Sequence, residues 1–524
     1  MTVDEYQADV LVLGGGPAGA WAAIAAARTG ARVVLADKGF CGTSGAAAAG
    51  GNNLWYVPPG PARDTAIDER ERAAGGLTGR DWMSRTLAET WERIEDLTAW
   101  GYPFPLDPAG RPIRSSLQGP EYMRRMRRRV HRGGVTILDH HPALELLATP
   151  EGAVAGAAGV ARQRDGARWR CRAGAVVLAT GGCAFLSKAF GLDVDTGDGH
   201  LMAAEVGAEL SGMEFSAAYA LSPAFGNHTK GLMMQFAHYY DESGRRLDLG
   251  GLPRVELARR AAAGEQLYAR LDQAPPELRE PARHAQPNYF LPLDKAGVDP
   301  FTTRYPIRFV LEGTVRGTGG LRLADDSCGT GIPGLYAAGD VATREPVSGA
   351  ISGGGSYNAA WAISTGTWAG SAAARFGTGR RADDVRPAGR AGLRPARGAD
   401  RTESAELVAL VQEQVTPLQR NYFRTAAGLT ESLGVLDDAW RRLADGLSAG
   451  TGRDLIRARQ AAAMTAHARW MYRSALARNE SRGLHRRDDA PRTDPAYTHR
   501  IVTGGLDRIW LRPEPVAVPA GAAA

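Results

Sequence analysis

The sequence predicts an α/β protein built on a parallel sheet, and three apolar runs carry this prediction. The first spans Ala8 to Leu13 and is followed by a glycine-rich turn, an alanine-rich helical stretch at 20–28 and a second apolar segment at 32–36. The other two runs, at 175–179 and 334–338, also lead into small residues. Continuous apolar runs indicate strands that are buried on both faces, as in a parallel sheet covered by helices.

The turn after the first strand has the spacing G-x-G-x-x-G. In this spacing Gly14 permits the tight turn, Gly16 lets the backbone approach a pyrophosphate, and Gly19 lets the helix pack close to the strand. Pro17 and Ala18 begin the helix, whose free N–H groups and partial positive charge favour phosphate oxygens. Strand, glycine turn, helix and strand together predict a dinucleotide site.

An acidic residue, Asp37, ends the second apolar segment, where its carboxylate would accept hydrogen bonds from a ribose. Such an acid disfavours a phosphate on that ribose, so FAD or NAD is favoured over NADP. Mostly small residues follow, which would let a flat ligand lie against the backbone; a flexible loop without a ligand is the alternative interpretation. The expected cofactor contacts in this segment are Lys38, Thr43, Ser44, Gly45, Gly50 and Gly51.

Composition and charge narrow the class of protein. With 524 residues, of which 44% are hydrophobic and 23% charged, the chain can form two or three domains with large cores. It shows no apolar run of membrane-spanning length and no signal peptide, so we expect a soluble, cytoplasmic protein. The four cysteines include no C-x-x-C pair, which argues against disulfides and against an iron–sulfur or zinc site. The net charge of +6 permits an anionic substrate or an acidic partner.

Two patterns that suggest nucleic acid or metal have simpler interpretations. Residues 123–132 contain six arginines, but only Tyr122 offers a stacking aromatic. We therefore expect a solvated helix face, or one that touches cofactor phosphates or an acidic partner, and no nucleic acid. His140 and His141 would point to opposite faces of a strand and have no third ligand nearby, so no metal site is expected.

Glycine-rich segments recur where later strands end or helices begin, at 180–182, 196–199, 339–340 and 353–356. The first and third follow apolar runs, as expected where the carboxyl ends of parallel strands face a ligand. The last precedes a long helical stretch at 357–376. The N-terminal dipole of that helix would stabilise negative charge on a bound ring.

These segments resemble those of a known family. GGGPAG, VVLATGG, TGDG and GLYAAGD, the last followed by a glycine-rich helix start, occur in this order. They resemble the flavoproteins of the succinate dehydrogenase and fumarate reductase family, which includes L-aspartate oxidase and the flavoprotein subunit of adenylylsulfate reductase. A fifth segment, 478–491, is similar to the R-x-E-S-R-G-x-H sequence in the helical C-terminal domain of succinate dehydrogenase and aspartate oxidase. Together the five segments cover nearly the whole chain.

The resemblance implies a Rossmann-like FAD-binding domain that is interrupted by an α+β capping domain and followed by a C-terminal helical domain. The implied bounds are 1–213 and 316–378 for the FAD-binding domain, 214–315 for the capping domain, 379–402 for a linker, and 403–524 for the helical domain and tail. The linker is rich in glycine, proline and arginine.

The resemblance also implies how the cofactor is held. FAD would be bound non-covalently, because Ser44 stands where succinate dehydrogenase has the histidine that is linked to its flavin. The further expected cofactor contacts are Ala143, Ala179, Thr180, Gly181, Asp198, Gly339, Asp340, Gly355, Ser356 and Tyr357.

Members of this family move a hydride between a flavin nitrogen and a substrate carbon, with a paired proton transfer. The arginine that carries the proton lies in a P-R-D-x-x-x-R stretch of the capping domain, and Pro253-Arg254-Val255 resembles its beginning. Arg254 is therefore the candidate proton carrier, although Val255 replaces the aspartate. A surface arginine on an amphipathic helix is the alternative interpretation.

The substrate half of the family pattern is altered. Tyr219 stands near the histidine of the family's Q-F-H-P-T, Val315 at the histidine of H-Y-x-M-G-G, and Ser352 at the arginine of N-R-L-G-G-N. We expect Tyr219 and Arg316 to take part in the site, with Trp55 as an aromatic surface. The expected substrate is a small polar molecule with one acidic group at most, and not succinate, fumarate or L-aspartate.

Three hypotheses for the activity follow. The first is a free-standing FAD-dependent dehydrogenase or oxidase that acts on a small molecule. The second is an electron-transferring flavoprotein subunit that needs an iron–sulfur partner, which the likeness of 353–356 to adenylylsulfate reductase favours and the short chain disfavours. The third, a flavoprotein that acts on RNA, rests on the arginine cluster alone. The oligomeric state is left open.

Overall fold

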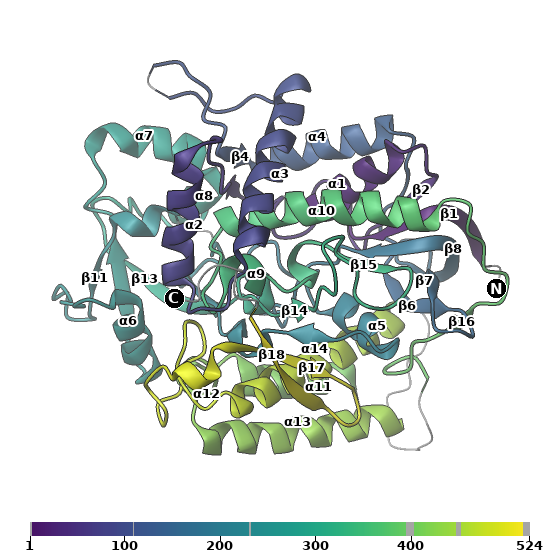
Figure 1. Cartoon of the computed structure of the whole chain (residues 1–524). Helices are drawn as coiled ribbons and strands as arrows, with labels where there is room; N and C mark the ends of the chain where they lie inside the picture. Colours follow the sequence, from purple (N-terminus) through teal and green to yellow (C-terminus); the bar gives the residue numbers. More distant parts are fainter. Residues whose placement is uncertain (1–2, 108, 230–231, 395–402, 447–451, 517–524) are drawn as a thin grey trace, which may run out of the picture.

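The structure is a computed structural model that describes residues 3–107, 109–229, 232–394, 403–446 and 452–516. Its centre is an eight-stranded sheet, counted over the described residues, in the order β16-β6-β7-β8-β1-β2-β5, with β15 pairing to β8 (Figure 1). The strands are β1 (Asp4–Leu13), β2 (Val33–Ala36), β5 (Thr136–Leu138), β6 (Ala143–Ala148), β7 (Val154–Ala161), β8 (Ala167–Leu178), β15 (Leu335–Ala337) and β16 (Arg386–Pro387). Strands β1, β2, β5, β8 and β15 are parallel to one another, whereas β6, β7 and β16 join antiparallel.

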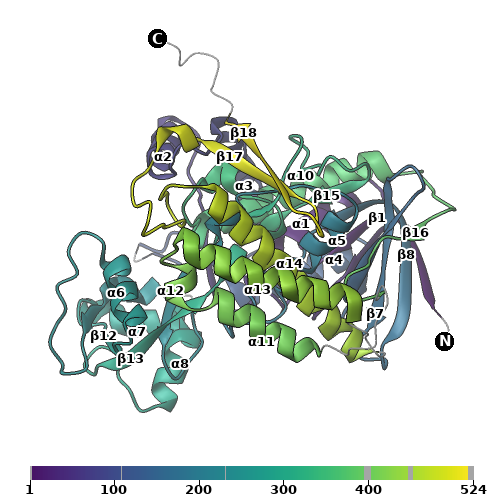
Figure 2. The same cartoon turned by 90° about the horizontal axis from the view of Figure 1, so that it is seen from below.

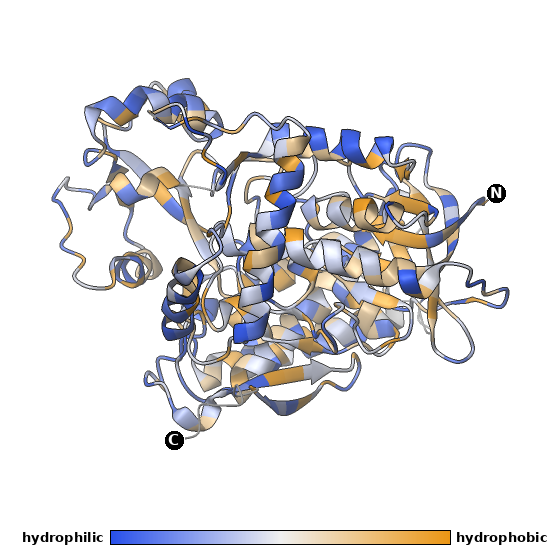
Figure 3. Ribbon diagram, turned by 45° about the horizontal axis from the view of Figure 1, so that its top comes forward, coloured by the Kyte–Doolittle hydropathy of each residue, from blue (hydrophilic) through white to orange (hydrophobic). Residues whose placement is uncertain are grey.

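The parallel part of the sheet is buried on both faces. Val10 and Val12 of β1 belong to a core with α1 (Pro17–Ala27), α4 (Gly119–Arg132) and α10 (Ser356–Gly377), whereas Leu11 and Leu13 belong to a core with α5 (Asp198–Glu205) and α14 (Arg453–Ala477). Alternate side chains of a strand point to opposite faces, so an unbroken apolar run serves both helical layers. The mixed α/β architecture expected from the sequence is confirmed, and Figure 3 shows hydrophobic residues concentrated in these inner strands.

Helix α10 lies against α1 and crosses α3 (Arg80–Ala99) in Figure 1. The approach to α1 requires glycine: a Cβ on Gly366 would lie 2.4 Å from the carbonyl oxygen of Ala18, and one on Gly370 would lie 2.2 Å from that of Ala22. Smaller elements on this side are α2 (Pro61–Ala73), α9 (Glu345–Ser348) and the two-stranded sheet of β3 (Gly51–Asn53) and β4 (Ser116–Gln118).

Within the segment between the two parts of the main sheet, the elements from β10 (Tyr219–Pro223) to β13 (Tyr305–Leu311) form a second sheet with its own helices, which we call the cap. Its sheet has the order β10-β13-β12-β11, with β11 (His238–Tyr240) and β12 (Leu267–Arg270). Helices α6 (Pro253–Ala262), α7 (Pro276–Ala285) and α8 (Pro287–Lys295) accompany it. The cap has its own hydrophobic core around Tyr289 and Tyr305, and Figure 2 shows it projecting from one side of the body.

The C-terminal part contains α11 (Ser404–Val415), α12 (Leu418–Asn421), α13 (Ala426–Gly446) and α14. Beyond the helices the structure adds a hairpin of β17 (His499–Gly504) and β18 (Trp510–Pro515), which the expected helical domain and tail did not include. The hairpin extends a sheet of order β14-β9-β17-β18 with β9 (Leu210–Ser211) and β14 (Gly320–Leu321). Part of the expected linker, 395–402, lies outside the described residues.

A buried ion-pair network joins the C-terminal part to the rest of the chain. Arg478 contacts Glu214 at 2.7 Å and Glu480 at 3.1 Å, and Arg482 contacts Glu480 at 2.6 Å. The side chains of Arg478, Glu214 and Glu480 are fully buried. Buried charges are tolerated only when they are paired, so the Arg-x-Glu-Ser-Arg segment fixes how these parts meet.

Candidate functional site

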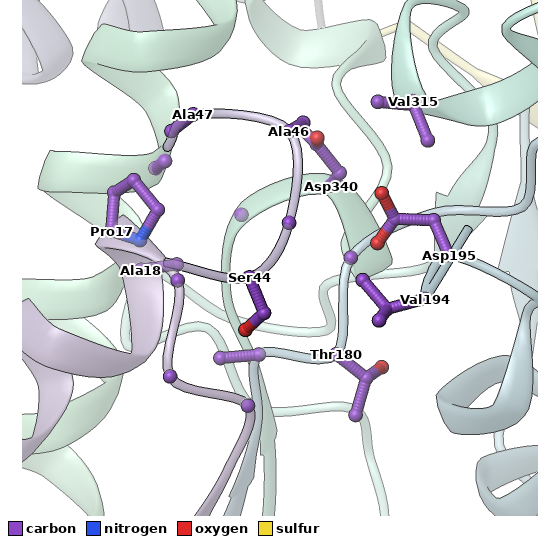
Figure 4. A pocket seen from close by; sticks show the side chains of 18 of the residues that line it. Pro17, Ala18, Ser44, Ala46, Ala47, Thr180, Val194, Asp195, Val315 and Asp340 are labelled. Carbon is purple, nitrogen blue, oxygen red and sulfur yellow. The ribbon is translucent and has the colours of Figure 1, made fainter. Parts of the chain in front are cut away.

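A cavity of about 1280 Å³, its open mouth included, lies where β1, β2, β8 and β15 end. Leu13 and Gly14, Ala36 and Asp37, Ala179 to Gly181, and Gly339 and Asp340 follow or end these four strands and line it. Figure 4 shows Pro17, Ala18, Ser44 and Thr180 around the same opening. The carboxyl ends of parallel strands are where ligands bind in open α/β sheets.

Most residues expected at the cofactor line this cavity: Gly14, Gly16, Pro17, Ala18, Asp37, Lys38, Ser44, Gly45, Gly51, Ala143, Ala179, Thr180, Gly181, Asp198, Gly339, Asp340 and Gly355. Gly19, Thr43, Gly50, Ser356 and Tyr357 are not among the lining residues. Gly19 serves packing instead, since a Cβ there would lie 1.8 Å from the carbonyl oxygen of Gly14. Tyr357 packs on Trp55, with ring centroids 4.8 Å apart, and the guanidinium carbon of Arg70 lies 4.0 Å from the centroid of the Tyr357 ring.

The glycine turn fits a pyrophosphate. Gly14 has φ 110°, in the region that favours glycine, and a Cβ there would lie 2.1 Å from the carbonyl oxygen of Ala179. A Cβ on Gly16 would meet no atom within 4 Å, so this residue faces open space in the cavity wall. Helix α1 starts at Pro17 directly beyond it, which aims the positive end of the helix dipole at that space.

Asp37 organises the loop that follows β2. Its carboxylate accepts N–H groups of Gly15 at 2.7 Å and Gly39 at 2.6 Å, and the hydroxyl of Ser44 at 3.0 Å. Burial raises the pKa of this carboxyl group, and the N–H donors and Ser44 oppose the rise. Asp37 lines the cavity while it holds both glycine segments, so its orientation is fixed before a ribose binds.

Lys38 and Asp198, two expected contacts far apart in the sequence, form one ion pair. Lys38 Nζ lies 2.6 Å from Asp198 Oδ2 and donates to Thr196 Oγ1 at 2.7 Å. The pair links the end of β2 to the first turn of α5 and closes one side of the cavity.

Another part of the cavity wall is formed by Val315, Arg316, Gly354 and Gly355. Behind it lies Arg344, a fully buried residue that sequence reasoning missed. Its guanidinium contacts Asp340 at 2.6 Å and donates to the carbonyl of Thr314 at 2.5 Å. Arg344 therefore ties the end of β15 to the segment that carries Arg316.

The cap reaches residues 49–51, beside the cavity, through two amides that were also missed. Asn288 donates to the carbonyl of Ala49 at 2.8 Å, and Gln286 Nε2 lies 3.3 Å from the place that a Cβ on Gly51 would take. No local pattern marks these residues, because their partners are more than 200 positions away.

The three catalytic candidates do not share the cavity. Arg316 lines the cavity, whereas Tyr219 and Arg254 are not among its lining residues. The Tyr219 hydroxyl donates to carbonyls of Val415 and Thr416 at 3.0 Å, on the side of the C-terminal helices, so it is engaged there and does not line the cavity as expected. Arg254 lies on the first turn of α6 and donates to the Tyr219 carbonyl at 2.7 Å.

Ser352 and Trp55 have structural surroundings as well. The Ser352 hydroxyl donates to the carbonyl of Arg316 at 2.8 Å and accepts the N–H of Gly354 at 3.1 Å, so it shapes the loop before α10. Trp55 is buried against Tyr357 and does not line the cavity. Asn358, in the first turn of α10, does line it and donates to the carbonyl of Val315 at 3.1 Å. A polar residue in the first turn after a glycine-rich helix start is the signal that could have found it.

The arginine-rich helix and the paired histidines have no place in the cavity. From α4 only Tyr122 lines it, while Arg125 pairs with Glu121 and Arg127 with Asp139 at 2.7 Å. Over the described residues there is no group of three or more His, Cys, Asp or Glu side chains arranged for a metal ion. Within the same residues, no helix has the length and apolar character needed to cross a membrane.

Comparison with known proteins finds flavoproteins among the similar chains. A family model described as "FAD binding domain" matches residues 9–291, and one described as "Fumarate reductase flavoprotein C-term" matches residues 406–518. L-aspartate oxidase of Mycobacterium leprae is 28% identical over 95% of both chains. One subunit of the fumarate reductase (CoM/CoB) of Methanothermobacter marburgensis is 26% identical over 96% of this chain and 98% of its own. E. coli quinol fumarate reductase FrdA superposes with a TM-score of 0.80 at 20% identity, over 100% of this chain and 99% of that one.

Proposed function

Because the chain belongs to the family of FAD-dependent oxidoreductases that includes the succinate dehydrogenase and fumarate reductase flavoproteins, we propose that it transfers a hydride between a small polar organic substrate and non-covalently bound FAD. The observation that carries the proposal is the cavity at the carboxyl ends of four strands, whose cofactor half follows the family pattern while its substrate half does not.

The residues present fit the cofactor. Gly14, Gly16 and the start of α1 would hold the pyrophosphate, and Asp37 would hold a ribose. Bound FAD supplies the two-electron donor or acceptor. The 22-residue helix α10 begins at Ser356 beside the lining residues Gly354 and Gly355, so its positive end favours negative charge in this part of the cavity.

The substrate proposal rests on lost dicarboxylate contacts. The three positions that hold a dicarboxylate in the family are occupied here by Tyr219, Val315 and Ser352. The Tyr219 hydroxyl donates to the carbonyl of Val415 in α11, and the Ser352 hydroxyl donates to the carbonyl of Arg316. A hydrogen bond to a charged group contributes roughly 1.5–3 kcal/mol, so three losses correspond to about 5–9 kcal/mol, or ~10³–10⁶ in affinity. We propose a substrate with one acidic group at most, held by Arg316.

L-aspartate is the main alternative substrate, since relatives carry the name L-aspartate oxidase. The test is to assay L-aspartate, succinate and fumarate at millimolar concentration with the FAD-loaded protein, using oxygen or a dye as electron acceptor or a reduced dye as donor. We expect no saturable turnover of any of them. Robust turnover of one would show that the site holds a dicarboxylate through arginines outside the family positions.

We also propose Arg254 as the proton carrier. The support is its match to the family sequence and the 2.7 Å hydrogen bond that fixes its guanidinium at the Tyr219 carbonyl of β10. Arginine is a poor acid in ordinary surroundings, so this role rests on the resemblance.

The second candidate function is a flavoprotein subunit that passes electrons to an iron–sulfur partner. The Methanothermobacter marburgensis relative, named as one of the subunits of a fumarate reductase, favours it. Purifying this chain alone and comparing turnover with oxygen and with a dye separates the two candidates. Turnover with oxygen supports the free-standing enzyme, whereas turnover with the dye alone supports the electron-transferring role.

A further inference from the structure

Three polar side chains, Thr229, Glu312 and Arg316, connect the cap to the cavity. The Thr229 hydroxyl donates to Glu312 Oε1 at 2.7 Å, and Glu312 Oε2 lies 3.7 Å from Arg316 Nε. The side chain of Glu312 is 4% exposed and that of Arg316 20%. This arrangement joins positions that the sequence separates by 83 residues.

The contact engages one side of the Arg316 guanidinium. Glu312 approaches the Nε side of Arg316, whereas its Nη1 lies 3.9 Å from the place that a Cβ on Gly355 would take, at the cavity wall. The two terminal nitrogens of arginine form a fork that matches the two oxygens of a carboxylate or a similar anion.

The backbone beneath Arg316 is fixed, so the side chain is what Glu312 can orient. A Cβ on Gly313 would lie 2.0 Å from the carbonyl oxygen of Cys183, which shows how closely this turn is packed. Ser352 donates to the Arg316 carbonyl, and Val315, the preceding residue, lies on the cavity wall in Figure 4. The position of the fork therefore depends on the carboxylate behind it.

We propose that Arg316 receives the single anionic group of the substrate, and that Thr229 and Glu312 are positioning residues that keep its terminal nitrogens directed at the cavity. The inference rests on the proposed function for the substrate. It adds the two residues that orient the Arg316 side chain. A buried carboxylate with both oxygens free for Arg316 would draw the guanidinium into a two-pronged ion pair, away from the cavity. Thr229 engages one oxygen, which favours the one-sided contact of the other oxygen with Arg316 Nε that the structure shows.

Thr229 and Glu312 also link the Arg316 side chain to the cap. Thr229 follows β10, Glu312 follows β13, and these two strands pair, with Tyr219 opposite Leu311. A displacement of the cap sheet therefore moves Thr229 and Glu312 together. The anion receptor is complete only when the cap holds the position seen in this structure.

The test measures anion binding to resting FAD-loaded protein, without turnover. Benzoate and the neutral, similarly shaped benzamide are titrated while the visible spectrum of the flavin is followed; acetate and sulfite serve as smaller anions. We expect saturable binding of at least one anion. Arg316→Gln weakens it by ~10–100-fold, the scale of a charged hydrogen bond, and leaves benzamide binding unchanged.

Thr229→Val removes the hydroxyl without changing charge, and we expect it to weaken anion binding by ~2–10-fold while FAD content stays normal. Thr229→Ser restores binding. Wild-type binding in Thr229→Val, undiminished binding in Arg316→Gln, or no anion binding by wild type would each overturn the proposal.

One further outcome shows whether Arg316 binds the negative charge of the substrate or that of the reduced flavin. If Thr229→Val shifts the reduction potential of the flavin and leaves benzoate binding intact, the terminal nitrogens of Arg316 stabilise the negative charge of the reduced cofactor. The assignment of Arg316 to the substrate is then wrong. Because benzoate binding needs no turnover, these results stand apart from the substrate assays that test the proposed function.

Discussion

Glu345, the first residue of α9, makes the stability of the fold depend on pH. Its side chain is fully buried, where it accepts hydrogen bonds from Ser211 and, at 3.4 Å, Thr343 through Oε2. Burial raises the pKa of its carboxyl group from 4.5 to about 7; the charge of Glu214 adds to the rise, and Arg500 and Arg478 oppose it. The folded protein therefore holds a proton on this carboxyl group at pH values where the unfolded chain has lost it.

The size and sign of the effect follow from proton linkage. A rise of about 2.5 units, at 1.36 kcal/mol per unit, corresponds to about 3 kcal/mol of unfolding free energy. Because the folded state binds the extra proton, this contribution is fully present below pH 4.5 and is lost as the pH rises through about 7. Glu345→Gln keeps the side chain neutral and removes the loss.

The assay is unfolding by heat or urea at intervals between pH 5 and pH 8, with saturating FAD throughout. We expect wild type to lose stability relative to Glu345→Gln as the pH rises, by an amount that approaches ~3 kcal/mol at pH 8. Glu242→Gln, a change at an exposed carboxylate, is the control and should follow wild type. A difference between wild type and Glu345→Gln that is constant with pH, or that shrinks as the pH rises, would refute the reasoning.

Four further predictions concern the cofactor, the chemistry and the packing of the glycine turn. FAD is non-covalent, because Ser44 cannot form a histidyl link; acid precipitation should leave the yellow colour in the supernatant, and colour in the pellet would contradict this. Arg254→Ala should lower turnover by at least ~100-fold at normal FAD content, the scale for a positioned acid or base, and near-wild-type turnover would remove Arg254 from the mechanism. Gly16→Ala should fold normally but lose FAD affinity in a fluorescence titration, because its Cβ would meet only cavity space. Gly19→Ala should instead lower the melting temperature of the protein, since its Cβ would lie 1.8 Å from the Gly14 carbonyl oxygen; equal melting temperatures in the two variants would refute this division.

The sequence predicted most of the expected cofactor residues that line the cavity, because their signals are local. Gly14, Asp37 and Gly339 each stand at the end of an apolar run, and a strand followed by glycine or an acid limits what the backbone can do there. The pairing of Lys38 with Asp198 was not predictable, although both residues were, because it depends on how β2 and α5 meet.

The residues of the substrate half were harder to predict, because the direction of each side chain decides whether it reaches the site. Tyr219 was placed by its position along a family sequence, yet its hydroxyl points to the carbonyls of Val415 and Thr416. Glu312 carries no local signal, since Thr229 lies 83 positions earlier. The C-terminal hairpin was missed because β17 is stabilised by β9, which lies in the first half of the chain.

The order of strands in the main sheet has a consequence for synthesis on the ribosome. β15 pairs with β8 and α10 packs on α1, yet both come after the whole cap in the chain. Gly339, Gly355 and Asn358 complete the cavity wall, so the emerging N-terminal segment cannot enclose the cofactor by itself. Cofactor capture must wait until α10 has left the exit tunnel, and until then the edge of β8 and the apolar face of α1 are exposed to chaperones and to misassembly.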